Sequence, residues 1–210
     1  GPTGEGISPI RRTCRMIDAS AAQPAQMSVT VPRCSRLGVI REDQDFTSGL
    51  SVSFDATEQV SETYAMQTGK RQQCTYEANR QIIHAKNKND QPIDIIFQVS
   101  NDGVAFRYHF PDASTDLKKI SEEVSTFNFP AEAKAWLQPM AEAKSGWNQT
   151  NPSYEEIYEK GIPVGQPAPS EAGWIFPALF NVNDTWVLIT ESALDRNYCG
   201  TRLSAKSEGG

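Results

Sequence analysis

Carboxylates and imidazoles are the side chains of this 210-residue chain best suited to acid–base or metal chemistry, and few of them are spaced for it. Glu122 and Glu123 are adjacent acids. On a strand their side chains point to opposite faces, so we expect one in solvent and one partnered. His84 and His109 lie far apart in the sequence without a ligand-spaced partner, so we expect both to be hydrogen-bonded structural residues. These four residues predict no catalytic group.

The cysteines form no CxxC pair, which excludes the usual zinc and thioredoxin motifs. They are Cys14, Cys34, Cys74 and Cys199. We expect free buried thiols. A disulfide between Cys14 and Cys34 is the alternative if the protein is exported, because oxidising compartments permit disulfides.

The remaining candidate functional residues lie within residues 130–173, a stretch that prolines interrupt throughout. Loops of this length are usually functional or disordered, and aromatic residues such as Trp147 favour function, because disordered segments are poor in aromatics. Glu155 and Glu156 follow in the block YEEIY, and together with Glu159 they are typical of solvated loop acids. The stretch predicts no regular element and an exposed Trp147.

The elements that must position these residues are strands, and residues 93–111 predict a β-hairpin. Apolar and polar residues alternate on both sides of a turn at residues 101–103, where Asp-Gly supplies the positive φ angles of a tight turn. Pro111 cannot donate to a ladder and ends the second strand. The buried face is expected to carry Ile93, Ile95, Phe97, Val99, Val104, Phe106, Tyr108 and Phe110.

Further segments alternate in the same way, and no amphipathic helix longer than two turns is evident. Strands are predicted at residues 37–40, 46–54, 62–66, 74–85, 120–129, 174–182 and 185–191. Trp186, between apolar neighbours, is expected in the core. Residues 1–34 are poorly patterned, and only residues 27–31 resemble a strand there. The fold class is therefore mainly β, with two packed antiparallel sheets formed within residues 35–210.

The charge of the chain limits its partners. A net charge of −6 with acids spread along the length argues against a nucleic-acid surface, which needs a clustered basic patch. No apolar run approaches the ~20 residues that a membrane-spanning helix needs.

Several blocks, in order, resemble one family. They are SETYAMQTGKRQQCTYEANRQ, NDGVAFRYHFP, ISEEVSTFNF, YEEIY and ITESALDRNYCGTRL, within residues 35–203. Together they resemble the N-terminal domain of glycoside hydrolase family 97, whose members include α-glucosidases and α-galactosidases.

The resemblance implies a β-supersandwich of the galactose-mutarotase type, followed in full proteins by a (β/α)8 barrel and a C-terminal β domain. A barrel takes about 250 residues and has no counterpart here. The resemblance thus implies that the catalytic carboxylates lie on the barrel, that this chain alone lacks them, and that it packs on the barrel beside an α-linked oligosaccharide substrate. The domain is also expected to be truncated at its C-terminal end, because family members continue for a few more strands.

For the site residues, the resemblance implies one metal ligand. In calcium-dependent members, a glutamate matching Glu155 reaches the barrel and helps hold Ca²⁺ beside the substrate. A single carboxylate cannot satisfy an ion that takes about 6–8 oxygen ligands, so the site must be completed from elsewhere. If the register slips by one residue, Glu156 is the ligand instead.

Two other functions stay open. A free-standing carbohydrate-binding sandwich would use Trp147 and Tyr154 as a platform, and a purely structural interaction domain would bind neither ion nor sugar. The resemblance also implies an exported protein, in the bacterial periplasm or at the cell surface.

Overall fold

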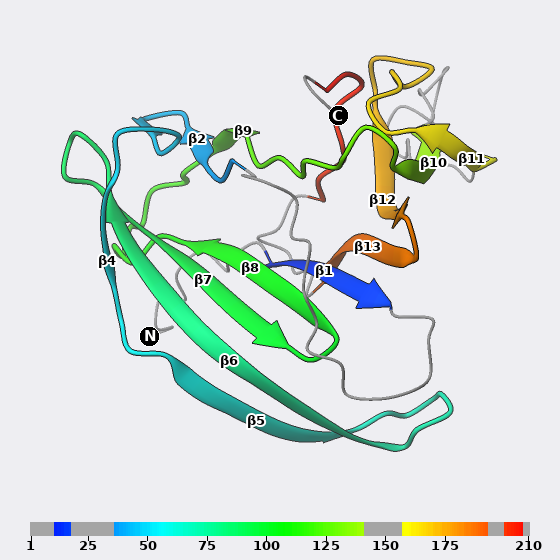
Figure 1. Cartoon of the computed structure of the whole chain (residues 1–210). Coiled ribbons are helices and arrows are strands. Elements are labelled where there is room, and N and C mark those ends of the chain that lie inside the picture. The colour runs from blue at the N-terminus through cyan, green and yellow to red at the C-terminus, as the bar shows by residue number, and fades with distance from the viewer. Residues whose placement is uncertain (1–10, 18–35, 141–156, 193–199, 208–210) are drawn as a thin grey trace. The chain divides into compact units, whose positions relative to one another are not determined.

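The computed structural model describes residues 11–17, 36–140, 157–192 and 200–207, and it is mainly β (Figure 1). Within these ranges every element is a strand, and no helix is long and apolar enough to cross a membrane. The expected fold class, an antiparallel β-sandwich, is confirmed. β1 (Arg11–Ile17) lies in the segment that predicts no strand before residue 27. The predicted strand at residues 27–31 lies outside the described ranges.

The chain divides into two compact units. The first comprises Gly1–Thr13, Leu37–Ser125 and Ser192–Tyr198, and the second comprises Cys14–Arg36, Thr126–Glu191 and Cys199–Gly210.

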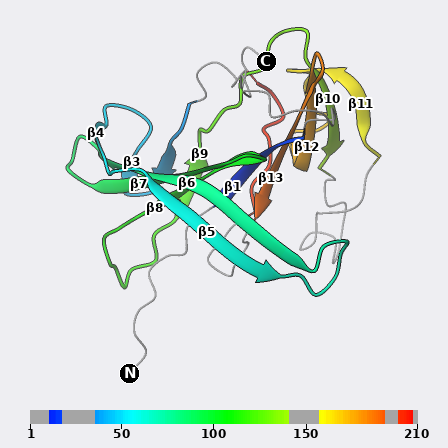
Figure 2. The same cartoon turned by 60° about the horizontal axis from the view of Figure 1, so that its bottom comes forward.

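An antiparallel sheet dominates the first unit. Its strands are β4 (Ser51–Phe54), β5 (Glu58–Ala65), β6 (Gln73–Lys86), β7 (Pro92–Ser100) and β8 (Gly103–His109). β6 pairs with β7 on one side, and β4 and β5 lie end to end along its other side. Figure 2 shows β5 and β6 continuing as a two-stranded ribbon past the end of β7, whose register with β6 begins at Ala78. The sheet therefore has an edge made of two consecutive short strands.

Local turns set the register of this sheet. Asn87 closes the β6–β7 turn, because its Oδ1 accepts hydrogen bonds from the amides of Asn89 and Gln91 at 2.9 and 3.0 Å. Asp90 in this turn has a positive φ of 58°, which Asp tolerates better than most residues. The position of the predicted turn between β7 and β8 is confirmed, with Ser100 opposite Gly103, but neither Asp102 nor Gly103 has the positive φ angle expected of Asp-Gly. Each strand thus meets its sequence neighbour directly.

The predicted alternation is confirmed on β8, but on β7 it is wrong in part, because Asp94 and Ile96 of the opposite face are buried as well. Ile93, Ile95, Phe106 and Tyr108 are buried, whereas Val99 is exposed at the far end of β7. A small second sheet of the first unit has the order β3 (Gln44–Asp45), β2 (Val39–Arg41), β9 (Ile120–Glu123). The predicted strand at residues 120–129 is therefore shorter in the structure, where β9 ends at Glu123.

The second unit contains a four-stranded run with the order β11 (Glu159–Pro163), β10 (Lys134–Pro139), β12 (Trp174–Val182), β13 (Thr185–Ser192). The prediction that residues 130–173 hold no regular element is wrong for β10 and β11. Pro139 and Pro163 stand at the ends of these strands, where a missing amide donor costs the ladder little. The prolines therefore punctuate strands here and do not exclude them.

One apolar cluster lies at the centre of the second unit. Its buried members are Phe129, Ala133, Ala135, Leu137, Trp174, Ala178, Phe180, Val187 and Ile189. Phe129 and Phe180 stack with ring centroids 4.2 Å apart. Leu203 exchanges two backbone hydrogen bonds with Trp174, at 3.0 and 2.8 Å, and so ties the following segment to the start of β12. These residues hold β10, β12 and β13 together.

Candidate functional site

The segment that carries the expected metal ligand connects β10 to β11. Glu155 and the alternative Glu156 lie outside the described residues, as do Trp147 and Tyr154. Both ends of the segment are fixed, because β10 and β11 pair antiparallel, with Leu137 opposite Glu159. Glu155 therefore belongs to the connection of a strand pair that is anchored in the second unit.

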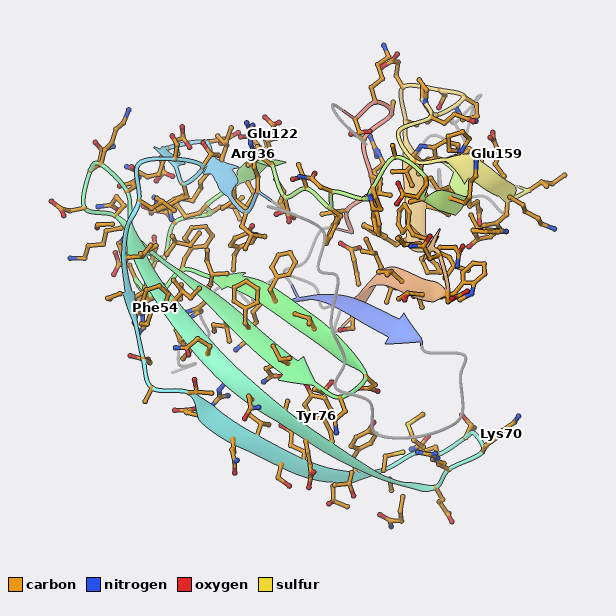
Figure 3. The ribbon with its side chains drawn as sticks, viewed as in Figure 1. Arg36, Phe54, Lys70, Tyr76, Glu122 and Glu159 are labelled. Atoms are coloured by element: carbon orange, nitrogen blue, oxygen red, sulfur yellow. The ribbon has the colours of Figure 1, made fainter. Side chains whose placement is uncertain are left out.

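Glu159, the third acid of this block, starts β11 (Figure 3). Its carboxylate accepts a hydrogen bond of 3.0 Å from Gln166 Nε2. On the other side of the connection, the amide of Met140 donates to the carbonyl of Gly173 at 2.8 Å. The connection is thus held where it leaves β10 and where it enters β11.

The described part of the chain gathers no group of three or more His, Cys, Asp or Glu side chains that could hold a metal ion. Ca²⁺ prefers carboxylate and carbonyl oxygens and takes about 6–8 of them. A calcium ion at Glu155 would therefore need ligands from outside the described residues.

The structure does bring together titratable groups that are distant in sequence. His84 on β6, Asp94 on β7 and His109 on β8 lie opposite one another across the sheet of the first unit. His84 Nδ1 lies 2.7 Å from Asp94 Oδ1, and His109 Nδ1 lies 2.9 Å from Asp94 Oδ2. The second ring nitrogen of His84, Nε2, lies 3.0 Å from Asp55 Oδ2, in the link between β4 and β5. These four residues, which we name the imidazole ladder, run across the sheet from its edge to β8.

The carboxylates control the charge of His84. Its hydrogen bond to Asp94, followed by the one to Asp55, raises the pKa of the His84 imidazole above the ordinary histidine value of 6.5, although desolvation opposes the shift. Asp94 is buried, while both imidazoles keep substantial contact with solvent. The arrangement therefore favours the protonated form of His84.

Both histidines are hydrogen-bonded, as the sequence predicts. In the structure they also share one partner, Asp94. The two turns that flank β7 contain the sequence information that brings these residues together. Once the β7–β8 turn is placed at residues 101–102, a regular hairpin puts Asp94 opposite His109, and the Asn87–Gln91 turn puts Asp94 opposite His84. Their grouping follows from register alone.

The tryptophans divide differently from the prediction. Trp174 is buried in the core of the second unit. The placement of Trp186 in the core is wrong, because Val187 and Ile189 face the core and Trp186 points to the opposite side of β13. There it is half-buried beside Trp136, with ring centroids 4.7 Å apart and the planes tilted by 53°. The predicted exposure of Trp147 stays a prediction.

The remaining candidates have structural surroundings. Glu191 accepts hydrogen bonds from the amide and the hydroxyl of Thr201. Glu122 is exposed (Figure 3) and Glu123 is half-buried, as alternation along a strand requires. Cys74 is free and half-buried, and the proposed disulfide of Cys14 with Cys34 stays untested.

Comparisons with known proteins extend these observations. Residues 25–210 match the family described as "Glycosyl-hydrolase 97 N-terminal". The chain is 29% identical over 175 residues to a "Probable retaining alpha-galactosidase" of Streptomyces bingchenggensis (strain BCW-1), covering 83% of this chain and 25% of that protein.

Solved structures agree with this match. A crystal structure of a β-arabinopyranosidase superposes with a TM-score of 0.78 at 35% identity, over 85% of this chain and 29% of the other. A glycoside hydrolase family 97 enzyme (E480Q) from Pseudoalteromonas sp. strain K8, in complex with panose, superposes with a TM-score of 0.57 at 17% identity, over 82% of this chain and 25% of the other. At that identity the second likeness shows the fold alone. The chain spans between a quarter and a third of the length of these relatives.

The resemblance of the sequence blocks is thus confirmed by a match that covers most of the chain and by the fold. The chain belongs to the glycosyl-hydrolase 97 N-terminal family.

Proposed function

We propose that this chain is the N-terminal domain of a longer α-glycosidase and that it packs on the catalytic barrel of the same polypeptide. The observation that carries the proposal is the family match over residues 25–210, in relatives that are three to four times longer and are named as glycosidases. On this account the chain shapes the mouth of the active site, and the catalytic carboxylates come from the barrel. The chain alone does not hydrolyse glycosides.

The relatives favour a galactoside-type substrate. The two with 29% and 35% identity are named for a galactoside and an arabinopyranoside, whereas the enzyme in complex with panose is only 17% identical. β-L-Arabinopyranose has the ring configuration of α-D-galactose without its exocyclic CH₂OH group, so one pocket fits both rings. We therefore propose α-galactosides as substrates ahead of α-glucosides.

A substrate panel tests this proposal. The continuous polypeptide containing this chain and the isolated chain are each assayed with p-nitrophenyl α-D-galactopyranoside, β-L-arabinopyranoside and α-D-glucopyranoside. We expect the continuous polypeptide to prefer the galactoside over the glucoside by at least about tenfold in kcat/KM, because a site that hydrogen-bonds one sugar hydroxyl rejects its epimer. Hydrolysis by the isolated chain would contradict the placement of the catalytic groups.

We also propose that Glu155 donates a carboxylate oxygen to a Ca²⁺ ion shared with the barrel. The family resemblance supports this role, and so does the position of Glu155 in a connection fixed at both ends by β10 and β11. When bound, such an ion positions the sugar and stabilises negative charge that develops in the transition state. This chain contributes one ligand and its orientation.

Calcium affinity separates the two possible registers. In the continuous polypeptide, Glu155→Gln should weaken calcium binding, measured by calorimetric titration, by at least about tenfold, because an amide oxygen carries no charge for the cation. Glu132→Gln changes an exposed acid elsewhere in the second unit and is the matched control. If Glu156→Gln weakens binding and Glu155→Gln does not, the ligand is Glu156.

Export to the periplasm or cell surface is part of the same proposal, since polysaccharides and long oligosaccharides do not cross membranes unaided. Cell fractionation of the source organism, with an antibody against this domain, tests it. Recovery in the cytoplasmic fraction alone would contradict it.

A further inference from the structure

The imidazole ladder, Asp55–His84–Asp94–His109, has no part in the proposed function and points to a second property of the domain. It runs from the β4–β5 link across β6, β7 and β8 of the larger sheet of the first unit. Its central member His84 touches a carboxylate with each ring nitrogen, at 2.7 and 3.0 Å. Whether His84 can keep both contacts depends on its protonation state.

A neutral imidazole has one N–H and one lone pair, whereas an imidazolium has two N–H donors. A carboxylate can only accept at ordinary pH, so His84 satisfies Asp94 and Asp55 together only when it is protonated. After deprotonation, one of its nitrogens carries a lone pair that faces a carboxylate oxygen. The contact to Asp55 is the weaker one, because it is longer and more exposed than the contact to Asp94. Asp55 is therefore the partner that His84 releases.

Asp55 lies in the gap between the two strands that form the edge of the sheet. The edge of the sheet is interrupted between Phe54, where β4 ends, and Glu58, where β5 begins. The Asp55 amide donates to the carbonyl of Ile82 at 3.2 Å, a long bond for a β-ladder. Gln81 Nε2 donates to the Asp55 carbonyl. The His84 contact holds the Asp55 side chain in addition to these backbone contacts.

Other charges face the same side of the sheet. Lys86 follows His84 by two residues on β6, and Arg107 precedes His109 by two on β8. Arg80, four residues before His84, is paired with Glu58 at 2.5 Å. On β7 the titratable group opposite His84 is Asp94, which His109 also contacts. The two carboxylates that touch His84 are Asp55 and Asp94.

We propose that protonated His84 fastens the junction of β4 and β5 to the sheet and that its deprotonation releases Asp55 and loosens this junction. The raised pKa of His84 gives the direction of the pH dependence. The stabilisation is fully present below the ordinary histidine value of 6.5 and is lost as the pH rises through the raised value. The junction is therefore tight below pH 6.5 and loosens as the pH rises above the raised pKa of His84.

Amide hydrogen exchange of the full chain tests the proposal. Protection of the peptide around Asp55–Thr57 is followed from pH 5.5 to 9, after correction for the intrinsic pH dependence of exchange. We expect protection to fall by about three- to tenfold across this range, since a partly exposed charge-assisted bond is lost. The amides of β7, which pair on both sides, serve as the internal reference.

Asp55→Asn is the decisive variant. An asparagine amide accepts from protonated His84 through its oxygen and donates to neutral His84 through its NH₂, so the pH dependence should disappear. The ring resonances of His84 should titrate at lower pH in this variant than in the unchanged chain. Asp112→Asn removes an exposed carboxylate without altering the ladder and should keep the original pH dependence.

His84→Gln gives a second check that does not depend on the titration of a ring. Its junction should exchange at one rate across the pH range. The proposal is overturned if protection at the junction in the unchanged chain is independent of pH, or if the Asp55→Asn variant keeps the same pH dependence.

Discussion

The sheets of the two units differ in what holds their strands together. In the second unit, nine buried apolar residues form one cluster on β10, β12, β13 and the adjoining segments. In the first unit, buried apolar residues such as Ile93 and Phe106 are accompanied by side-chain hydrogen bonds that run across the larger sheet, and several large apolar residues are exposed. These are Val52, Phe54, Tyr64, Met66, Val99 and Leu117. Both units therefore bury apolar residues, and the larger sheet of the first differs in that it also carries side-chain hydrogen bonds across its strands and exposes apolar side chains.

Removing a large core side chain should give the largest effect. Phe180→Ala deletes a buried ring that stacks on Phe129, and it should lower the free energy of unfolding by about 4 kcal/mol through lost burial and a cavity. Phe54→Ala, at a side chain that is 64% exposed on β4, should change it by no more than about 0.5 kcal/mol. Urea unfolding of both variants measures the contrast. Equal losses of unfolding free energy in the two variants would contradict the difference between the buried and the exposed side chain.

A glycine at the start of β12 should follow in size. Gly173 has a φ of +82°, and a Cβ added there would stand 2.1 Å from the Leu203 carbonyl oxygen. Gly173→Ala should therefore cost about 3 kcal/mol, from backbone strain plus displacement of Leu203. Gly49→Ala in the first unit, with a φ of +64° and no atom within 4 Å, carries only the strain and should cost about 1 kcal/mol. Thermal unfolding of the two variants separates the clash from the strain.

A buried hydroxyl of the first unit should have the smallest effect of the three. Tyr108 Oη accepts from the amide of Gly38 at 2.7 Å and is bonded to Ser125 at 2.7 Å. Tyr108→Phe should cost about 1–2 kcal/mol, because it leaves a buried amide without its acceptor. Tyr76→Phe removes a half-buried hydroxyl whose bond to Gln98 is 3.2 Å, so a smaller loss is expected. Urea unfolding gives both values, and a larger loss for Tyr76→Phe would contradict the importance of the Gly38 contact.

The same contrast separates what the sequence could predict from what it could not. β6, β7 and β8 are joined by short turns that contain Asn and Asp, so their register follows from local residues. β10 and β11 pair across a long connection, and the prolines of this stretch argue against strands in the sequence, although Pro139 and Pro163 only end them. Long-range pairing leaves no local signal in a single sequence.

The candidate residues follow the same pattern. The structural roles of the two histidines were predictable from their positions on strands. The link of His84 to Asp55 was not, because β4 reaches β6 over a long intervening segment. The face that Trp186 occupies depends on which alternate residues of β13 meet the core, and an apolar run on both sides hides that choice.

The calcium dependence of hydrolysis by the continuous polypeptide tests the central claim most directly. We predict that a chelator abolishes hydrolysis of p-nitrophenyl α-D-galactopyranoside, that added Ca²⁺ restores it, and that Glu155→Gln needs at least about tenfold more Ca²⁺ for half-maximal activity. Activity that is indifferent to chelation, or a Glu155→Gln variant with an unchanged calcium requirement, would contradict the account of this domain as a contributor to the active site.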